Sequence, residues 1–250
     1  MTEGLVSVIM PTYNCAKFIS ETLDSIQAQT YENWEIVIVD DCSKDNTKEI
    51  VDAYIARDPR IKYFCLEVNS GAAVARTKAM ELADGEYMAF CDSDDLWMPD
   101  KLERQLAFMK ENGYAFTCTA YEQVNEETEP LNRVIKTKKK TNYNRLLLDC
   151  PVGNSSVMYS VKQMGKFEVP NIRKRNDDAL WLQMLKKEEY IYGMPDVLMR
   201  YRIRSNSISS NKLSVIKYHW ILYREIEHLN VFRSAFHICW WCFLKVFHIK

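Results

Sequence analysis

Glycine and proline are scarce in this chain, which has 7 of each among 250 residues. So few glycines leave little room for a glycine-rich phosphate loop, and PTYNCAKF (11–18) does not fit the G-x-G-x-x-G pattern of dinucleotide-binding oxidoreductases. The formal net charge is −1, so overall charge gives no argument for nucleic-acid binding. The N-terminal MTEGLVSVIM has no basic region and no long apolar run, which predicts a strand rather than a signal peptide.

The eight cysteines lack the spacing of a metal site. They are scattered and mostly stand among apolar residues, so we expect reduced thiols in the core. Cys239 and Cys242 form one C-x-x-C, but no second pair and no nearby His-x-His completes a set of four zinc ligands.

Hydrophobic runs and helical spacings alternate through the first hundred residues. We expect strands over 5–12, 34–41, 61–67 and 87–91 and helices over 15–29, 46–57 and 72–83. This order predicts an α/β fold with a mainly parallel central sheet and helices on both faces. Ligands of such sheets bind beyond the carboxyl ends of the strands. Three polar clusters stand there: residues 11–14, 40–41 and 92–95.

The pattern loosens after residue 99. We expect a helix over 99–112, a strand over 115–124, a solvated loop over 125–145, a strand over 152–159 and a helix over 176–187. We therefore divide the chain into one domain over 1–210 and a helical tail over 211–250. The domain has a nucleotide-binding half (1–100) and an acceptor half (101–210).

Three aspartates within four positions, Asp92, Asp94 and Asp95, follow the predicted strand at 87–91. Their carboxylates repel one another, and a hard divalent cation such as Mg²⁺ or Mn²⁺ would offset that repulsion. Such ions take one or two carboxylates, with diphosphate oxygens and water completing the shell. Capping of the helix that begins at Pro99 explains one of the acids but not three, so the pattern favours a metal–nucleotide site.

Four segments resemble glycosyltransferase family 2, the inverting enzymes of the GT-A (Rossmann-like) fold. They are VSVIMPTYN (6–14), SIQAQTYENWEIVIVDDCSKDNT (25–47), NSGAAVARTKAMELADGEYMAFCDSDD (69–95) and NDDALWL (176–182). The resemblance is dense over residues 5–100 and weaker to about 210. Cys42 stands where the family often has Gly, and Thr77 where it often has Asn, but neither replaces a chemical group.

The resemblance implies a nucleotide site formed by Pro11, Tyr13, Asp40, Asp41, Arg76, Asp92 and Ser93. Asp41 is similar to the family carboxylate that accepts a hydrogen bond from uracil, with Asp40 the less certain partner. Asp94 is the implied direct metal ligand, and Asp92 is expected near the ribose and the metal. For Asp40 and Asp41 the structural alternative is capping of the next helix, and for Arg76 it is a surface salt bridge.

An inverting transferase needs a carboxylate that takes the acceptor's proton. In family 2 this base stands four residues before a tryptophan, which corresponds to Asp177 before Trp181, with Asp178 in reserve. Capping of the helix at 176–187 is the structural alternative for both acids. Arg202 and Arg204 resemble a family segment that folds over the diphosphate, although an ordinary basic loop fits them as well.

The tail is rich in large apolar side chains, but charged residues interrupt it, which excludes a membrane span. On a helical wheel Arg233, His237, Lys245 and His248 share one sector, which predicts a helix lying on an anionic membrane surface. Packing of the same helix on the domain or on a partner subunit is the alternative.

The sequence thus predicts a metal-dependent transfer of a hexose or N-acetylhexosamine from a UDP-sugar to a lipid-linked glycan of a bacterial surface polysaccharide. The expected location is the cytoplasmic face of the inner membrane. An inactive, nucleotide- or glycan-binding scaffold is the alternative, against which the acids at 92, 94 and 177 argue. Phosphorylation receivers and aspartyl-phosphate phosphohydrolases are excluded by the position of the acidic motifs in the chain.

Overall fold

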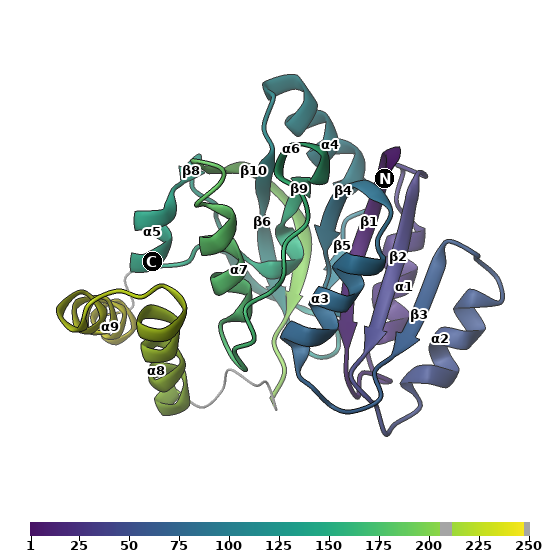
Figure 1. The fold of residues 1–250 in the computed structure, drawn as a ribbon. Helices are drawn as coiled ribbons and strands as arrows, with labels where there is room; N and C mark the ends of the chain where they lie inside the picture. The colour runs from purple at the N-terminus through teal and green to yellow at the C-terminus, as the bar shows by residue number, and fades with distance from the viewer. Residues whose placement is uncertain (206–211, 248–250) are drawn as a thin grey trace.

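The computed structural model describes residues 1–205 and 212–247, apart from the side chains of 212–214, 245 and 246. One mixed sheet forms its centre, in the order β3-β2-β1-β4-β9-β6-β10-β5, with β7 paired to β6 and β8 to β10. Helices lie in front of the sheet and behind it (Figure 1). The predicted α/β class with a mainly parallel sheet is confirmed.

The strands are β1 (Thr2–Thr12), β2 (Trp34–Asp40), β3 (Ile61–Cys65), β4 (Gly85–Phe90), β5 (Leu96–Trp97), β6 (Phe116–Val124), β7 (Pro130–Ile135), β8 (Lys140–Thr141), β9 (Met158–Ser160) and β10 (Ile191–Arg202). The helices are α1 (Ile19–Gln27), α2 (Thr47–Ile55), α3 (Ala72–Leu82), α4 (Lys101–Asn112), α5 (Tyr143–Leu148), α6 (Val161–Met164), α7 (Asn176–Met184), α8 (Lys212–Ile221) and α9 (Val231–Val246). A 3₁₀ turn, η1, spans Asn154–Ser156, and a π-helical turn, η2, spans Leu222–Ile226.

The four strands of the N-terminal half run parallel. Both faces are buried along β2, β4 and the second half of β1, whereas the edge strand β3 is partly exposed. Alternation along β1 sends Val8 and Met10 to the core cluster that contains α1, and Ile9 to the cluster that contains α3. Strands covered on both sides need continuous apolar runs, which is what VSVIM and IVIV supply. All four carboxyl ends therefore point to the same edge of the sheet.

The C-terminal half departs from the predicted outline. The solvated loop expected over 125–145 contains β7, β8 and the start of α5. The strand expected over 152–159 is the turn η1 followed by the short strand β9, which runs antiparallel between β4 and β6. These elements are short and gain their stability from pairing with distant segments, so no local hydrophobic period marks them.

The tail packs on the domain through one side and exposes another. Leu222, Tyr223 and Leu229 join the core that contains α3 and α7, and the Tyr223 hydroxyl donates to the Leu147 carbonyl over 2.9 Å. Among the described residues, no helix is both long and apolar enough to cross a bilayer.

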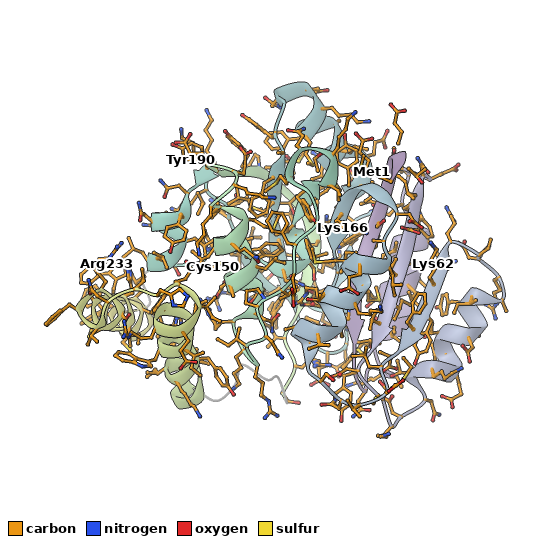
Figure 2. All side chains as sticks on the ribbon, viewed as in Figure 1. Met1, Lys62, Cys150, Lys166, Tyr190 and Arg233 are labelled. Carbon is orange, nitrogen blue, oxygen red and sulfur yellow. The ribbon has the colours of Figure 1, made fainter. Side chains whose placement is uncertain are left out.

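The predicted basic sector of the tail is wrong at His237. This ring is buried, 5.4 Å from the ring of Tyr223, and burial lowers its pKa. Arg233 is exposed at the outer edge of the molecule (Figure 2). The side chain of Lys245 and all of His248 lie outside the described residues. The exposed face of α9 is instead an aromatic stripe, formed by Phe232, Phe236, Trp240, Phe243 and Phe247.

Candidate active site

Hydrogen bonds tie together the loops that follow β1, β2 and β4. The Asp41 amide donates to the Thr12 carbonyl over 2.9 Å, and the Asn14 amide donates to the Ser43 hydroxyl over 2.8 Å. The Cys15 thiol donates to the Ser93 carbonyl over 3.1 Å. The three polar clusters predicted at the sheet edge are therefore neighbours, as parallel strands require.

Asp41 is buried and anchors the chain that leads into α3. One carboxylate oxygen accepts from the Ser70 amide over 2.6 Å and the other from the Gly71 amide over 2.8 Å. Gly71 has φ +94°, a conformation that side-chain-bearing residues rarely adopt. Asp41 is thus held rigidly at the entrance of α3, in the region predicted to receive the nucleotide base.

Asp40 lies away from this cleft. Its carboxylate is fully buried. It accepts from the Ser43 amide and from the Tyr63 hydroxyl, each over 2.7 Å. One carboxylate oxygen thus binds the turn between β2 and α2, and the other binds β3. We therefore remove Asp40 from the predicted nucleotide-binding residues. Asp40 does not cap α2 either, because the N-cap residue is Asn46 and the Ser43 amide precedes the helix.

The wall next to Asp41 comes from the end of β1 and from the turn after β2. Pro11 is buried, whereas the Tyr13 side chain is about half exposed (48%) and free to receive a planar ligand. Cys42 has φ +64°, and its thiol donates to the Leu66 carbonyl over 2.7 Å. A left-handed backbone explains why glycine would suit position 42.

Asp92 accepts two hydrogen bonds on a single oxygen. The guanidinium of Arg76, on α3, donates to Asp92 Oδ1 over 3.1 Å, and the Asn154 amide donates to the same oxygen over 2.7 Å. Asp92 Oδ2 has no partner among the described residues, and about a third of the side chain is exposed (31%). Burial and the neighbouring Asp94 raise the pKa of Asp92, against the effect of Arg76.

Asp94 and Asp95 differ although they are adjacent. Asp94 is partly exposed and pairs with Arg204 over 3.0 Å. Asp95 is buried, where it accepts hydrogen bonds from the Ser155 hydroxyl and from the Arg202 amide. Burial raises the pKa of both carboxyls. Asp95 therefore holds the loop in place, while Asp94 remains available to a ligand. Ser93, between Asp92 and Asp94, is buried, and its carbonyl accepts hydrogen bonds from the Cys15 thiol and from the Thr22 hydroxyl of α1.

Arg202 does not lie where a diphosphate could reach it. Its side chain is fully buried, and its guanidinium donates to the carbonyls of Asp94 and Glu126 and to the side chains of Thr128 and Glu21. Each nitrogen already has a partner, so the prediction of a phosphate contact by Arg202 is not supported. Arg204, about a quarter exposed, is the arginine that remains beside the acids.

The first turn of α7 presents Asp177 and buries Asp178. Asp177 is partly exposed, and its charge contributes to the raised pKa of Asp92, which places the two carboxylates near each other. Asp178 forms an ion pair with Arg175, and burial raises its pKa to about 6. Cys150 lies beside this part of α7 (Figure 2). The geometry therefore favours Asp177 over Asp178 as a base.

Arg76 connects the acids of β4 to α7. Besides Asp92, its guanidinium donates to the side-chain oxygen of Asn176, one residue before Asp177. Arg76 is itself buried, so this link is rigid. The surface salt bridge considered from the sequence is therefore excluded, and Arg76 sets the spacing between the Asp92 carboxylate and the candidate base.

The residues at the end of β4 fit a divalent cation. Within the described part of the chain, Asp92 offers a carboxylate oxygen without a protein partner, and the Asp94 carboxylate pairs only with the partly exposed Arg204. Two oxygen ligands are typical of Mg²⁺ and Mn²⁺ sites that diphosphate and water complete. Among the described residues no group of three or more His, Cys, Asp or Glu side chains forms a metal cage.

The sequence analysis did not predict Asn154 and Ser155 as residues of the site. Both are buried in η1, where Asn154 binds Asp92 and Ser155 joins the backbone of Asp92 to the side chain of Asp95. The only local signal is the polar run GNSS (153–156) inside an otherwise strand-like segment. Partners some 60 residues apart carry no periodic signal, so these contacts become visible only in the folded chain.

Comparisons with known proteins agree with this geometry. Residues 7–170 match the sequence model described as Glycosyl transferase family 2. A Bacillus subtilis protein that bears the name teichuronic acid biosynthesis glycosyltransferase TuaG is 45% identical over 97% of this chain and 94% of its own length. An Escherichia coli protein, UDP-Glc:alpha-D-GlcNAc-diphosphoundecaprenol beta-1,3-glucosyltransferase WfgD, is 38% identical over 88% of this chain and 85% of its own.

The fold is similar to that of a solved transferase. The crystal structure of S. aureus TarS 1-349 in complex with UDP-GlcNAc superposes with a TM-score of 0.71. It covers 93% of this chain and 69% of TarS 1-349, at 23% sequence identity. At this identity the likeness concerns the fold alone.

Proposed function

The chain belongs to glycosyl transferase family 2 and is a glycosyltransferase, and from this premise we propose that it moves a hexose or N-acetylhexosamine from a UDP-sugar to a hydroxyl of a lipid-linked glycan. One observation carries the proposal. Asp92 and Asp94 stand at the carboxyl end of β4, and Arg76 joins Asp92 to the helix that presents Asp177. Residues 1–100 would bind the nucleotide and 101–210 the acceptor.

Asp177 acts as the general base. An acceptor hydroxyl attacks the anomeric carbon from the face opposite the diphosphate, and its proton passes to the Asp177 carboxylate. As the new C–O bond forms, the bond to the diphosphate oxygen breaks, so the configuration inverts. Asp178 keeps its contact with Arg175 and fixes the first turn of α7.

Asp94, with Asp92 beside it, would hold Mg²⁺ or Mn²⁺. Such an ion supplies positive charge to the departing diphosphate. Arg204 now neutralises Asp94 and stands where it can add a further positive charge to the diphosphate. Arg76 keeps Asp92 oriented toward the ribose side of the cleft.

We infer a uracil nucleotide from the residues at the ends of β1 and β2. Asp41 is fixed by two backbone amides, and Pro11 and Tyr13 form the wall next to it. The structurally similar TarS binds UDP-GlcNAc, and the name of WfgD specifies UDP-Glc as donor. Both names support UDP without deciding which sugar is carried.

The names of the relatives also guide the choice of acceptor. WfgD acts on a GlcNAc-diphosphoundecaprenol and TuaG is named for teichuronic acid. We therefore propose a lipid-diphosphate glycan of a bacterial surface polysaccharide, such as O-antigen, capsule or lipooligosaccharide. The enzyme would work in the cytoplasm, peripheral to the inner face of the membrane, with the tail (211–250) docking through its aromatic stripe.

A transfer assay tests the proposal. Purified protein with Mn²⁺ is incubated with UDP-glucose, UDP-galactose or UDP-GlcNAc and a GlcNAc-diphosphate-lipid acceptor, and release of UDP is followed together with the product's mass. We expect turnover with one donor, abolished by EDTA and by Asp177→Asn. Binding of UDP with no turnover on any acceptor of this class would favour the alternative, an inactive nucleotide- or glycan-binding scaffold at the membrane surface.

A further inference from the structure

Two tyrosines on neighbouring strands face the same cleft. Tyr121 lies on β6 and Tyr201 on β10, and these strands pair in parallel with Met199 opposite Tyr121. Residues two apart share a face of a strand, so Tyr121 and Tyr201 lie on the same side of the sheet. Their ring centroids are 5.9 Å apart with the planes tilted by 55°. Both side chains are half-buried.

Contacts place Tyr121 beside η1. A Cβ atom added at Gly153 would lie 2.8 Å from the Tyr121 ring, so only glycine admits the ring there. The next residue, Asn154, donates to the Asp92 carboxylate. Burial raises the pKa of the Tyr121 phenol, and Asp95 and Asp177 raise it further. Tyr121 therefore lies against the turn that binds Asp92.

Tyr201 is also next to the loop of acids. It immediately precedes Arg202, whose backbone amide donates to the Asp95 carboxylate over 3.0 Å and whose guanidinium donates to the Asp94 carbonyl. Arg76 links Asp92 to Asn176, next to Asp177, so the two rings border the region between the proposed metal ligands and Asp177. The diphosphate must lie at one end of that region and the acceptor hydroxyl at the other, so the anomeric carbon lies between them.

Neither phenol has a hydrogen-bond partner among the described residues, and both hydroxyls remain accessible to solvent. Half-buried tyrosines usually find a partner for the hydroxyl, and the nearby Asp95 carboxylate does have its partners. Two aromatic faces with free hydroxyls are suited to a ligand that carries both C–H surfaces and hydroxyl groups.

We propose that Tyr121 and Tyr201 form the subsite for the sugar being transferred. The rings pack against the C–H face of the pyranose, and the two phenols exchange hydrogen bonds with its hydroxyls. Gly153 is the residue that makes room for the first ring. This inference rests on the proposed function, because it takes the donor to be a nucleotide diphosphate sugar.

Titration calorimetry with UDP and with UDP-sugars tests the subsite. UDP and each of three UDP-sugars (glucose, galactose and N-acetylglucosamine) are titrated in Mn²⁺ into wild type, Tyr121→Phe, Tyr201→Phe and Tyr121→Ala. The control is Tyr192→Phe, a tyrosine of β10 stacked on Tyr114 with centroids 3.7 Å apart. Thermal melts verify that each variant is folded. The measured quantity is the ratio of the two dissociation constants, UDP-sugar to UDP.

We expect UDP to bind all variants equally. For the sugar that wild type turns over or binds best, each Phe variant should raise the ratio by about five-fold, as for one lost hydrogen bond, and Tyr121→Ala should raise it further. Tyr192→Phe should leave it unchanged. An unchanged ratio in the three cleft variants, or parallel weakening of UDP and UDP-sugar, would overturn the subsite. Failure of wild type to bind either ligand would overturn the proposed function instead.

Discussion

Two adjacent aspartates illustrate how little separates an accessible carboxylate from a structural one. Asp177 and Asp178 stand in the same helical turn, yet one is partly exposed beside Asp92 and the other is buried against Arg175. Arg175 has φ +66°, a conformation that is costly for a residue with a side chain. The ion pair with Asp178 stabilises that turn, and this leaves Asp177 directed into the cleft.

Substitution separates the two roles. Asp177→Asn should lower kcat by roughly 10²- to 10⁴-fold because the base is lost, while the free energy of unfolding stays within about 0.5 kcal/mol. Asp178→Asn leaves the Arg175 guanidinium without its counter-charge and should destabilise by about 2 kcal/mol. Steady-state kinetics and urea unfolding at pH 7.5 measure both quantities. The opposite pattern would assign the base to Asp178.

The buried Lys101 makes the free energy of unfolding depend on pH. Its side chain is fully buried, with Nζ donating to Gln105 over 2.7 Å and lying 4.3 Å from the centre of the Trp97 ring. Burial lowers the pKa of Lys101 to about 7. The unfolded chain holds this proton up to about pH 10, so the free energy of unfolding rises with pH between about 7 and 10.

Lys101→Met should remove that rise. From pH 7 to pH 9, wild type should gain about 2 kcal/mol more than the variant. Urea unfolding of both proteins at the two pH values provides the comparison, in which all other titrating groups cancel. Parallel pH dependence of the two proteins would show that Lys101 keeps its proton in the folded state.

At the scale of elements, sequence-based prediction is accurate where an element is stabilised by its own local sequence pattern. It fails where the stabilising contacts come from distant segments. β1, β2, β4 and α3 carry their own hydrophobic runs or helical spacing, and their predicted bounds lie close to those observed. β7 and η1 do not, because they are stabilised by pairing with β6 and with the loop after β4. For the same reason the sequence did not predict a role for Asn154. The three acids could be predicted because the repulsion among carboxylates within four positions is a local feature of the sequence.

The aromatic stripe of α9 predicts membrane binding by a specific face. Replacing Phe236 and Phe243 together by Ser removes apolar surface that would otherwise enter a bilayer, and each buried side chain of this size contributes about 2 kcal/mol. We therefore expect on the order of a tenfold loss or more in co-flotation with phosphatidylglycerol vesicles.

Phe64→Ser is the matched control for the stripe. Phe64 is an exposed aromatic residue of β3, which lies at the opposite side of the molecule from α9 (Figure 1), so its replacement should leave vesicle binding unchanged. Equal flotation of the double variant and wild type would indicate that the stripe is covered by something other than lipid.

At the scale of the whole molecule, the tail is part of the folded unit. Glu227 pairs with Lys186 over 2.8 Å and accepts from the Tyr143 hydroxyl, which links the tail to both α5 and the segment after α7. Leu222, Tyr223 and Leu229 are buried in the same core as Trp181. The sequence presented membrane docking and packing on the domain as alternatives, but different sides of the tail allow both.

Removing residues 212–250 should therefore destabilise the remaining domain. Three large side chains leave the core, which corresponds to on the order of 5 kcal/mol. Urea unfolding followed by tryptophan fluorescence, compared with the full chain, measures the loss. A truncated protein as stable as the full chain would show that the tail is an independent appendage.

The central claim is that Asp92 and Asp94 hold a divalent cation that in turn holds a nucleotide diphosphate. The most direct measurement is calorimetric titration of UDP with Mn²⁺ and with EDTA into wild type, Asp94→Ala and the control Asp100→Ala. Among the described residues, the Asp100 carboxylate pairs with Arg104 over 3.1 Å. We predict Mn²⁺-dependent binding in wild type and Asp100→Ala that Asp94→Ala loses. Equal binding with EDTA, or by Asp94→Ala, would contradict the account.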